Sequence, residues 1–199
     1  MHFRLVMLPV ILLFWASCTE EPEEKVRIPE SIVAGQTSGN GIVYTNPQPD
    51  DSFYFAGLAS QEVFYDLNRD GNDDLVFSMT DYPDSVSGYY SASLRPVYPN
   101  QIVRTPQLDY YLRPLNAGDT IGRNSYWHEG SAFMFYEGWD PGHHWSTGQW
   151  DTIRHAFAGV KLITGTDTSY CWISLFHSKE PPHALVIRDY AYTIRYTEP

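Results

Sequence analysis

The fold is decided by TIRHAFAGVKLI (Thr152–Ile163), SYCWISLF (Ser169–Phe176) and ALVIRDYAY (Ala184–Tyr192). Each stretch holds two aliphatic residues two positions apart: Val160 and Leu162, Ile173 and Leu175, and Leu185 and Ile187. Residues two apart project from the same face of a strand, so each pair can face a core while its neighbours face away from it. All three stretches are therefore predicted to be half-buried β-strands.

Short alternating or aromatic-rich runs continue this pattern through the rest of the chain. Further predicted strands are Gly41–Thr45, Phe53–Ala56, Glu62–Asp66, Asp74–Met79, Gln101–Thr105, Asp109–Arg113 and Ala132–Tyr136. From Ser31 onward no stretch keeps the apolar spacing of three and four that is typical of amphipathic helices. We therefore expect an all-β fold, an antiparallel β-sandwich or jelly roll of about ten short strands, over residues 31–199.

Composition excludes some functions. The 199 residues carry 13 Lys and Arg against 24 Asp and Glu, a formal net charge of −11. Such an acidic surface repels phosphate backbones, which argues against nucleic acid as a partner. Aromatic residues make up 16% of the chain, enough to build a packed core and to argue against disorder.

The N-terminus has the layout of an export signal. Arg4 is followed by an apolar run, Leu5–Trp15, that is too short to span a bilayer but typical of a signal-peptide core. Ala16, Ser17 and Cys18 follow, and this order resembles the lipobox of bacterial lipoproteins, with Trp15 where the lipobox usually has Leu. The resemblance implies a signal peptide over residues 1–17 and a lipid on Cys18. The alternative is ordinary secretion without lipidation.

Residues 18–30 are predicted to be a solvated tether between the membrane and the domain. The run Glu20-Glu21-Pro22-Glu23-Glu24 is acidic, and such a run after a lipidated cysteine resembles the export signal of some surface lipoproteins. We expect an outer membrane lipoprotein, surface-exposed or periplasmic. With Cys18 lipidated, Cys171 is the remaining thiol, so no internal disulfide is expected.

The sequence Asp66–Phe77 (DLNRDGNDDLVF) is the strongest candidate site. Oxygen-bearing side chains alternate along it, and Gly71 permits a sharp turn. Calcium takes six to eight oxygen ligands, and such alternation curls side chains around one centre. The predicted Ca²⁺ ligands are Asp66, Asn68, Asp70, Asn72 and Asp74, with Asn72 contributing its carbonyl group. The alternative is an Asx-rich turn that binds no metal.

This loop resembles the calcium loops of EF-hands and of FG-GAP repeats. The twelfth position is Phe77 rather than Glu, and both flanks are strand formers, as in FG-GAP repeats. The C-terminal motifs Phe157–Leu162, Tyr170–Leu175 and Asp189–Tyr192 add a similarity to small exported bacterial proteins that pair such a loop with F-x-G-V and Y-G-W endings. Cys171 stands where that pattern has Gly. These resemblances imply a β-fold and export, and no reaction.

A glycine-rich stretch contributes three tryptophans, Trp139, Trp145 and Trp150. They could form a stacking platform for sugar rings, or they could fold inward and hold a long loop against the domain; packing is the favoured interpretation. No spacing singles out a catalytic acid, base or nucleophile, and the histidines lack a zinc motif. We therefore expect a non-catalytic, membrane-anchored lipoprotein with a structural or adhesive role, whose partner is a glycan or a surface protein. A carbohydrate-binding module is the alternative, and a glycan-active enzyme a weaker one.

Overall fold

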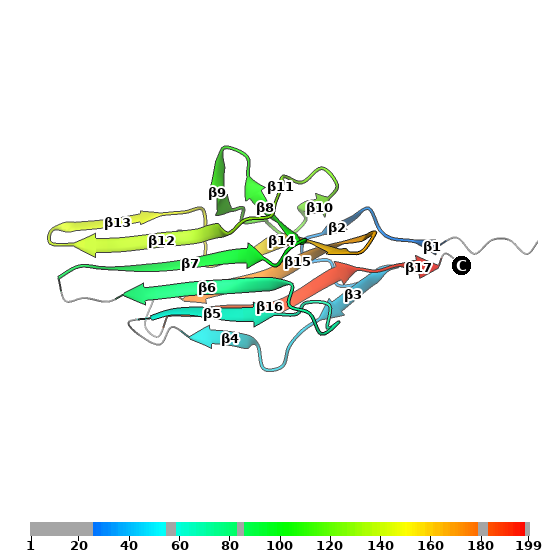
Figure 1. Cartoon of the computed structure of the whole chain (residues 1–199), viewed down its shortest axis with the longest axis horizontal. Helices are drawn as coiled ribbons and strands as arrows, with labels where there is room; N and C mark the ends of the chain where they lie inside the picture. Colours follow the sequence, from blue (N-terminus) through cyan, green and yellow to red (C-terminus); the bar gives the residue numbers. More distant parts are fainter. Residues whose placement is uncertain (1–25, 55–58, 83–85, 179–182, 198–199) are drawn as a thin grey trace, which may run out of the picture.

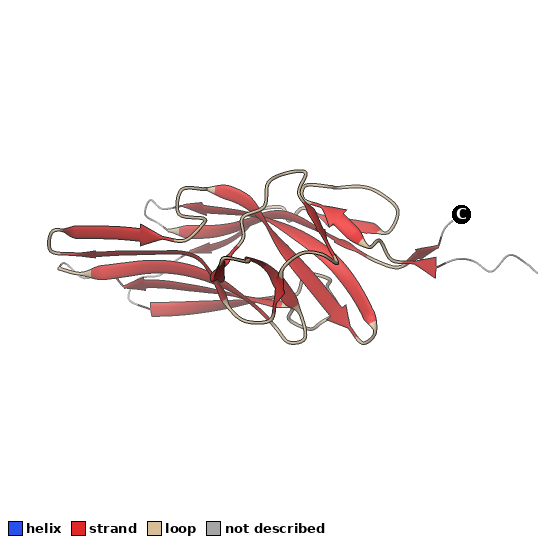
Figure 2. Ribbon diagram, turned by 90° about the horizontal axis from the view of Figure 1, so that it is seen from above, coloured by secondary structure: helices blue, strands red, loops and turns tan. Residues whose placement is uncertain are grey.

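The computed structural model describes residues 26–54, 59–82, 86–178 and 183–197. These residues form strands and loops, with no helix among them (Figure 2). The predicted signal peptide, Cys18 and residues 18–25 of the tether lie outside the described residues. Within the described ranges, no helix is long and apolar enough to cross a membrane.

The first large sheet contains the three stretches that decide the fold. Its strands are β3 (Ile42–Thr45), β4 (Asp51–Tyr54), β8 (Gln101–Thr105), β11 (Trp127–His128), β14 (His155–Thr164), β15 (Asp167–Ser178) and β16 (Ala184–Thr193). β16 pairs along its length with β15, and its other edge pairs with β3 and β4 in turn. β14 then joins β15 to β8, and every pairing is antiparallel.

The second large sheet packs against the first. Its strands are β5 (Ala59–Tyr65), β6 (Leu75–Tyr82), β7 (Gly88–Pro96), β12 (Ala132–Asp140) and β13 (His143–Thr147), which run side by side in Figure 1. One further strand, β9 (Leu108–Leu112), pairs antiparallel with β8 and parallel with β12. The two sheets are therefore one curled sheet that closes along this edge into a sandwich.

The main core lies between the two sheets. β6 contributes Leu75, Phe77 and Met79, all fully buried, and β15 contributes Cys171, Ile173 and Leu175. In both strands these residues stand two apart, as the period of a half-buried strand requires. The same period places Leu185 and Ile187 of β16 in this core, which the aliphatic pairs of the sequence predicted.

A smaller core lies on the outer face of the first sheet. There β2 (Ser31–Val33) and β10 (Thr120–Gly122) form a two-stranded ribbon that covers Trp172. Ile32 and Ile121 of the ribbon pack in the same cluster, and the indole Nε1 of Trp172 donates a 3.1 Å hydrogen bond to the carbonyl oxygen of Gln36. β15 is thus buried on both faces.

The all-β sandwich-like fold predicted from the sequence is confirmed, and each of the ten predicted strands overlaps an observed one. The longest strand that the pattern missed is β7, which is central to the second sheet. β1 (Val26–Arg27) pairs with β17 (Tyr196–Thr197), so the first strand that the structure describes lies within the predicted tether of residues 18–30. Figure 1 shows this pair at one end of the molecule.

The double burial of β15 generates a stability prediction. Trp172→Ala removes a fully buried indole between the ribbon and the sheet, and is expected to lower the free energy of unfolding by about 3–5 kcal/mol. Trp145→Ala is the matched control, because Trp145 is 40% exposed, and it should change stability by no more than about 0.5 kcal/mol. Urea unfolding followed by circular dichroism measures both; equal losses in the two variants would contradict this picture.

Candidate functional site

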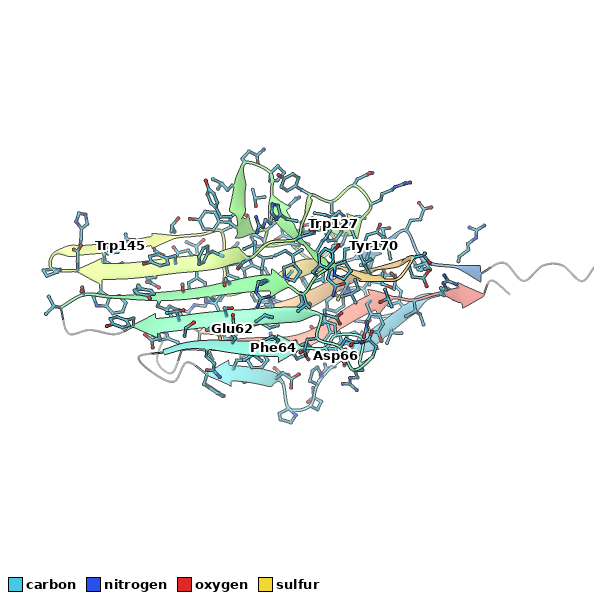
Figure 3. The ribbon with its side chains drawn as sticks, viewed as in Figure 1. Glu62, Phe64, Asp66, Trp127, Trp145 and Tyr170 are labelled. Atoms are coloured by element: carbon cyan, nitrogen blue, oxygen red, sulfur yellow. The ribbon has the colours of Figure 1, made fainter. Side chains whose placement is uncertain are left out.

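The predicted calcium ligands lie in the loop that joins β5 to β6. Glu62 and Phe64 of β5 lead into it, and Asp66 stands at its start, toward the end of the molecule that carries β1 and β17 (Figures 1 and 3). Two residues turn the chain with positive φ angles, Arg69 at 59° and Gly71 at 90°. A Cβ added at Gly71 would meet nothing within 4 Å, so the glycine serves the backbone conformation rather than a close approach.

Side-chain oxygens of the first half of the loop converge on its own backbone amides. The N–H of Asp70 is shared by Asp66 Oδ1 at 3.2 Å and Asn68 Oδ1 at 2.9 Å, and the N–H of Gly71 donates to Asp66 Oδ2 at 2.8 Å. Asp70 Oδ1 in turn accepts the N–H of Asn72 at 2.9 Å. These Asx-type bonds fold the loop and bring the oxygens of Asp66 and Asn68 close together.

Asp74 occupies a different position from the other predicted ligands. Its side chain is buried, and Oδ2 accepts the N–H of Leu67 at 2.9 Å. Oδ1 accepts the amide of Asn100 at 3.0 Å, and Asn100 Oδ1 accepts the N–H of Ile163 at 2.8 Å. Asp74 therefore fastens the loop to the β7–β8 connection and to β14.

The two environments shift the carboxyl groups in opposite directions. Hydrogen bonds from the backbone and side chain of Asn72 lower the pKa of Asp70, because they stabilise its ionised form. Burial raises the pKa of Asp74, against the opposing hydrogen bonds from Leu67, Asn68 and Asn100. Asp70 is thus an exposed, ionised carboxylate, the form that a cation requires, whereas Asp74 is a buried structural group.

The donors that the loop offers are carboxylate and amide oxygens. In the part of the chain that the structure describes, no three His, Cys, Asp or Glu side chains gather as a metal-binding group. Calcium also takes amide and backbone carbonyl oxygens, and Asn68 and Asn72 supply these in the loop. Of the five predicted ligands, Asp66, Asn68 and Asp70 share one exposed turn and accept hydrogen bonds from within the loop, whereas Asp74 is buried and also accepts a hydrogen bond from Asn100 outside the loop.

The three tryptophans of the predicted sugar platform are separated by the structure. Trp150 is fully buried in the main core and its Nε1 donates to the carbonyl of Leu112 at 3.0 Å, so it folds inward, which is the interpretation that the sequence favoured, and it is not available for stacking. Trp139 pairs with His144, and Trp145 with Gly138, in the β12–β13 hairpin. Since successive strand residues alternate, Trp139 and Trp145 lie on opposite faces of that hairpin.

Cysteine and histidine are the other reactive residue types of the sequence analysis. Cys171 is fully buried, and burial raises the pKa of its thiol well above the usual range, so it is no thiolate nucleophile. His143 and His144 are neighbours on β13 and project from opposite faces, as the sequence indicated. His144 Nε2 lies 3.2 Å from a carboxylate oxygen of Glu137 across the hairpin.

Two groups of residues were not predicted from the sequence. Asn100 is the partner of Asp74, although nothing in its local sequence marks it. Tyr82, Tyr89 and Tyr136 stack across three strands, with ring centroids 5.8 Å and 5.6 Å apart and rings within 16° of parallel. Their alignment depends on strand register, for which a single sequence gave no signal.

No protein family model, curated protein or solved structure matches this chain. Its function is therefore inferred from its own residues.

The position of Asp74 yields a prediction. Asp74→Ala leaves the buried amide groups of Leu67 and Asn100 without their acceptor, and should lower the free energy of unfolding by about 1–3 kcal/mol. Asp73→Ala is the matched control, since Asp73 is exposed and should have little effect on stability. Chemical denaturation of both variants without calcium checks this. A loss in Asp73→Ala as large as that in Asp74→Ala would show that charge, rather than hydrogen bonding, holds the loop.

Proposed function

We propose that this chain is an exported, lipid-anchored lipoprotein whose β-sandwich has a structural or adhesive role, and that one calcium ion stiffens its β5–β6 loop. The role is non-catalytic. Lipid on Cys18 would hold the protein at the outer membrane, and the sandwich would present a binding surface to a glycan or a surface protein.

The observation that carries the calcium proposal is the shared amide of Asp70. Oxygens of Asp66 and Asn68 already meet at this one N–H, and Asp70 itself is exposed and ionised. A cation at this turn would be held by Asp66, Asn68, Asp70 and the carbonyl of Asn72, with water completing the shell. The ion would neutralise Asp66 and Asp70, whose charges otherwise repel each other.

The anchor proposal is supported by the position of the first strand. β1 lies at one end of the elongated sandwich, so a tether from Cys18 enters there, and the β5–β6 loop lies toward the same end (Figure 1). The β12–β13 hairpin with Trp145 extends at the opposite end (Figure 3). A protein anchored through its N-terminus would thus direct the hairpin away from the membrane.

Calcium binding predicts a thermal shift. Calcium at about a hundred times its dissociation constant stabilises the native state by about 2.7 kcal/mol, which for a domain of this size raises the melting temperature by about 5–10 °C. Differential scanning fluorimetry of the full chain in EDTA and in added calcium measures the shift.

Variants separate binding at the loop from effects elsewhere. Asp70→Ala should abolish the calcium-dependent shift, whereas Asp73→Ala, which changes the net charge equally, should retain it. An unchanged wild-type melting temperature in calcium would sink the calcium proposal and leave the loop as an Asx-rich turn.

Lipidation is tested by substitution of each cysteine in turn. Cys18→Ala should abolish incorporation of labelled palmitate during expression in a Gram-negative host and release the protein from the membrane fraction. Cys171→Ala should keep both properties, because Cys171 is buried in the core. Palmitate labelling that persists in Cys18→Ala would contradict the anchor proposal.

A further inference from the structure

A row of aromatic rings crosses the outer face of the second sheet. Tyr82 of β6 lies directly opposite Tyr89 of β7, and their rings are 5.8 Å apart and 14° from parallel. Tyr136 of β12 stacks on the other side of Tyr89, at 5.6 Å and 16°. Tyr90, the neighbour of Tyr89, faces the main core, so strand alternation turns this tyrosine row to the outside.

Trp145 extends the row onto a fourth strand. In the sheet register Gly138 of β12 lies between Tyr89 of β7 and Trp145 of β13. A Cβ on Gly138 would come within 2.4 Å of the indole of Trp145, so the indole lies directly against this glycine. The row thus covers three strand spacings, about 14 Å, and its outermost rings, Tyr82 and Trp145, are 50% and 40% exposed.

Hydroxyl groups surround the rings on the same face. Alternation places the following accessible small polar side chains there: Ser60, Ser78, Thr80 and Thr147. Several are already oriented by each other, as in the 3.2 Å bond from Thr80 Oγ1 to Ser60 Oγ and the 2.8 Å contact of Tyr111 Oη with Thr147 Oγ1. The face therefore alternates between flat apolar rings and hydrogen-bonding groups.

The charge of this face differs from that of the whole chain. Among the described residues of β5, β6, β7, β12 and β13, alternation places three Asp, Glu, Lys or Arg side chains on the outer face: Glu62 and Arg95, which lie 3.8 Å apart, and Asp140 at the tip of the β12–β13 hairpin. Glu62 and Arg95 compensate each other, which leaves the carboxylate of Asp140 as the remaining charge on this face of a chain whose net charge is −11. A face of such low charge density, with rings and hydroxyl groups, complements a neutral partner that is itself rich in hydroxyl groups.

We propose that this face binds a neutral polysaccharide chain. The C–H faces of sugar rings would pack on the two exposed outer rings, Tyr82 and Trp145, while Tyr89 and Tyr136 between them hold the row in place. The sugar hydroxyl groups would bond to the flanking serines and threonines. The length of the row fits several linked sugars rather than one. This inference rests on the adhesive role proposed above and names the class of ligand for that role. It requires neither the calcium ion nor the lipid.

Affinity electrophoresis of the full chain through gels that contain a neutral polysaccharide tests the inference. The probes are hydroxyethyl cellulose, soluble starch, xylan, galactomannan and mixed-linkage β-glucan, with polygalacturonate as the charged comparison. At least one neutral polymer should retard the wild type, and Trp145→Ala and Tyr89→Ala should each weaken that binding by about tenfold. Tyr54→Ala, an exposed tyrosine on β4 of the first sheet, should bind as the wild type does.

Tyr89→Phe keeps the ring and should retain binding, which separates loss of stacking from loss of fold; melting temperatures of all variants are measured alongside. Retardation by none of the neutral polymers, retardation by polygalacturonate alone, or wild-type affinity in both Trp145→Ala and Tyr89→Ala would overturn the inference. Polysaccharide binding in EDTA should equal binding in calcium. The absence of a calcium-dependent thermal shift would therefore contradict the calcium proposal alone, and the absence of retardation by neutral polysaccharides would contradict this inference alone.

Discussion

The buried carboxylate of Asp74 is the constraint on which the arrangement of both sheets depends at one end of the sandwich. It accepts the amide of Leu67 inside the β5–β6 loop, and through Asn100 it reaches the backbone of Ile163 at the end of β14. One carboxylate therefore links a turn of the second sheet to a strand of the first. Burial disfavours its charged form and raises its pKa, so these hydrogen bonds must offset the desolvation for the link to stabilise the fold.

The class of fold could be predicted because the spacing of apolar residues within strands and the turn residues between strands are local properties of the sequence. In β15 the aliphatic pair Ile173 and Leu175 marks the core face, and the structure places both there. β7 was missed because its outward positions include Ser91 and Ser93, and small polar residues give little strand signal. Those two serines are nonetheless almost fully buried in the folded sheet. Tertiary packing, rather than local propensity, makes this stretch a strand.

The candidate site shows the same division between local and long-range information. The alternation from Asp66 to Asp70 and the glycine at position 71 are readable in one loop, and the structure gathers Asp66, Asn68 and Asp70 in one turn. Asn100, the partner that ties Asp74 to the rest of the sandwich, lies 26 positions away, and no short motif records such a distance. Trp150 illustrates the converse, because its proximity in sequence to Trp145 left a shared surface open as the alternative to packing, and only the structure shows that the chain returns Trp150 to the core after the hairpin.

A row of tyrosines on the outer face of a sheet requires apolar, buried residues on the inner face of the same strands. Each strand that presents Tyr82 or Tyr136 outward must bury its alternate residues, and Met79 of β6 and Phe135 of β12 fill that role in the main core. The rings on the outside are therefore fixed in register by apolar packing on the inside, and a slip of one residue would exchange the two sets. A rigid aromatic surface loses little conformational freedom on contact with a ligand. The core that stabilises the sandwich thus also preorganises its outer face for binding.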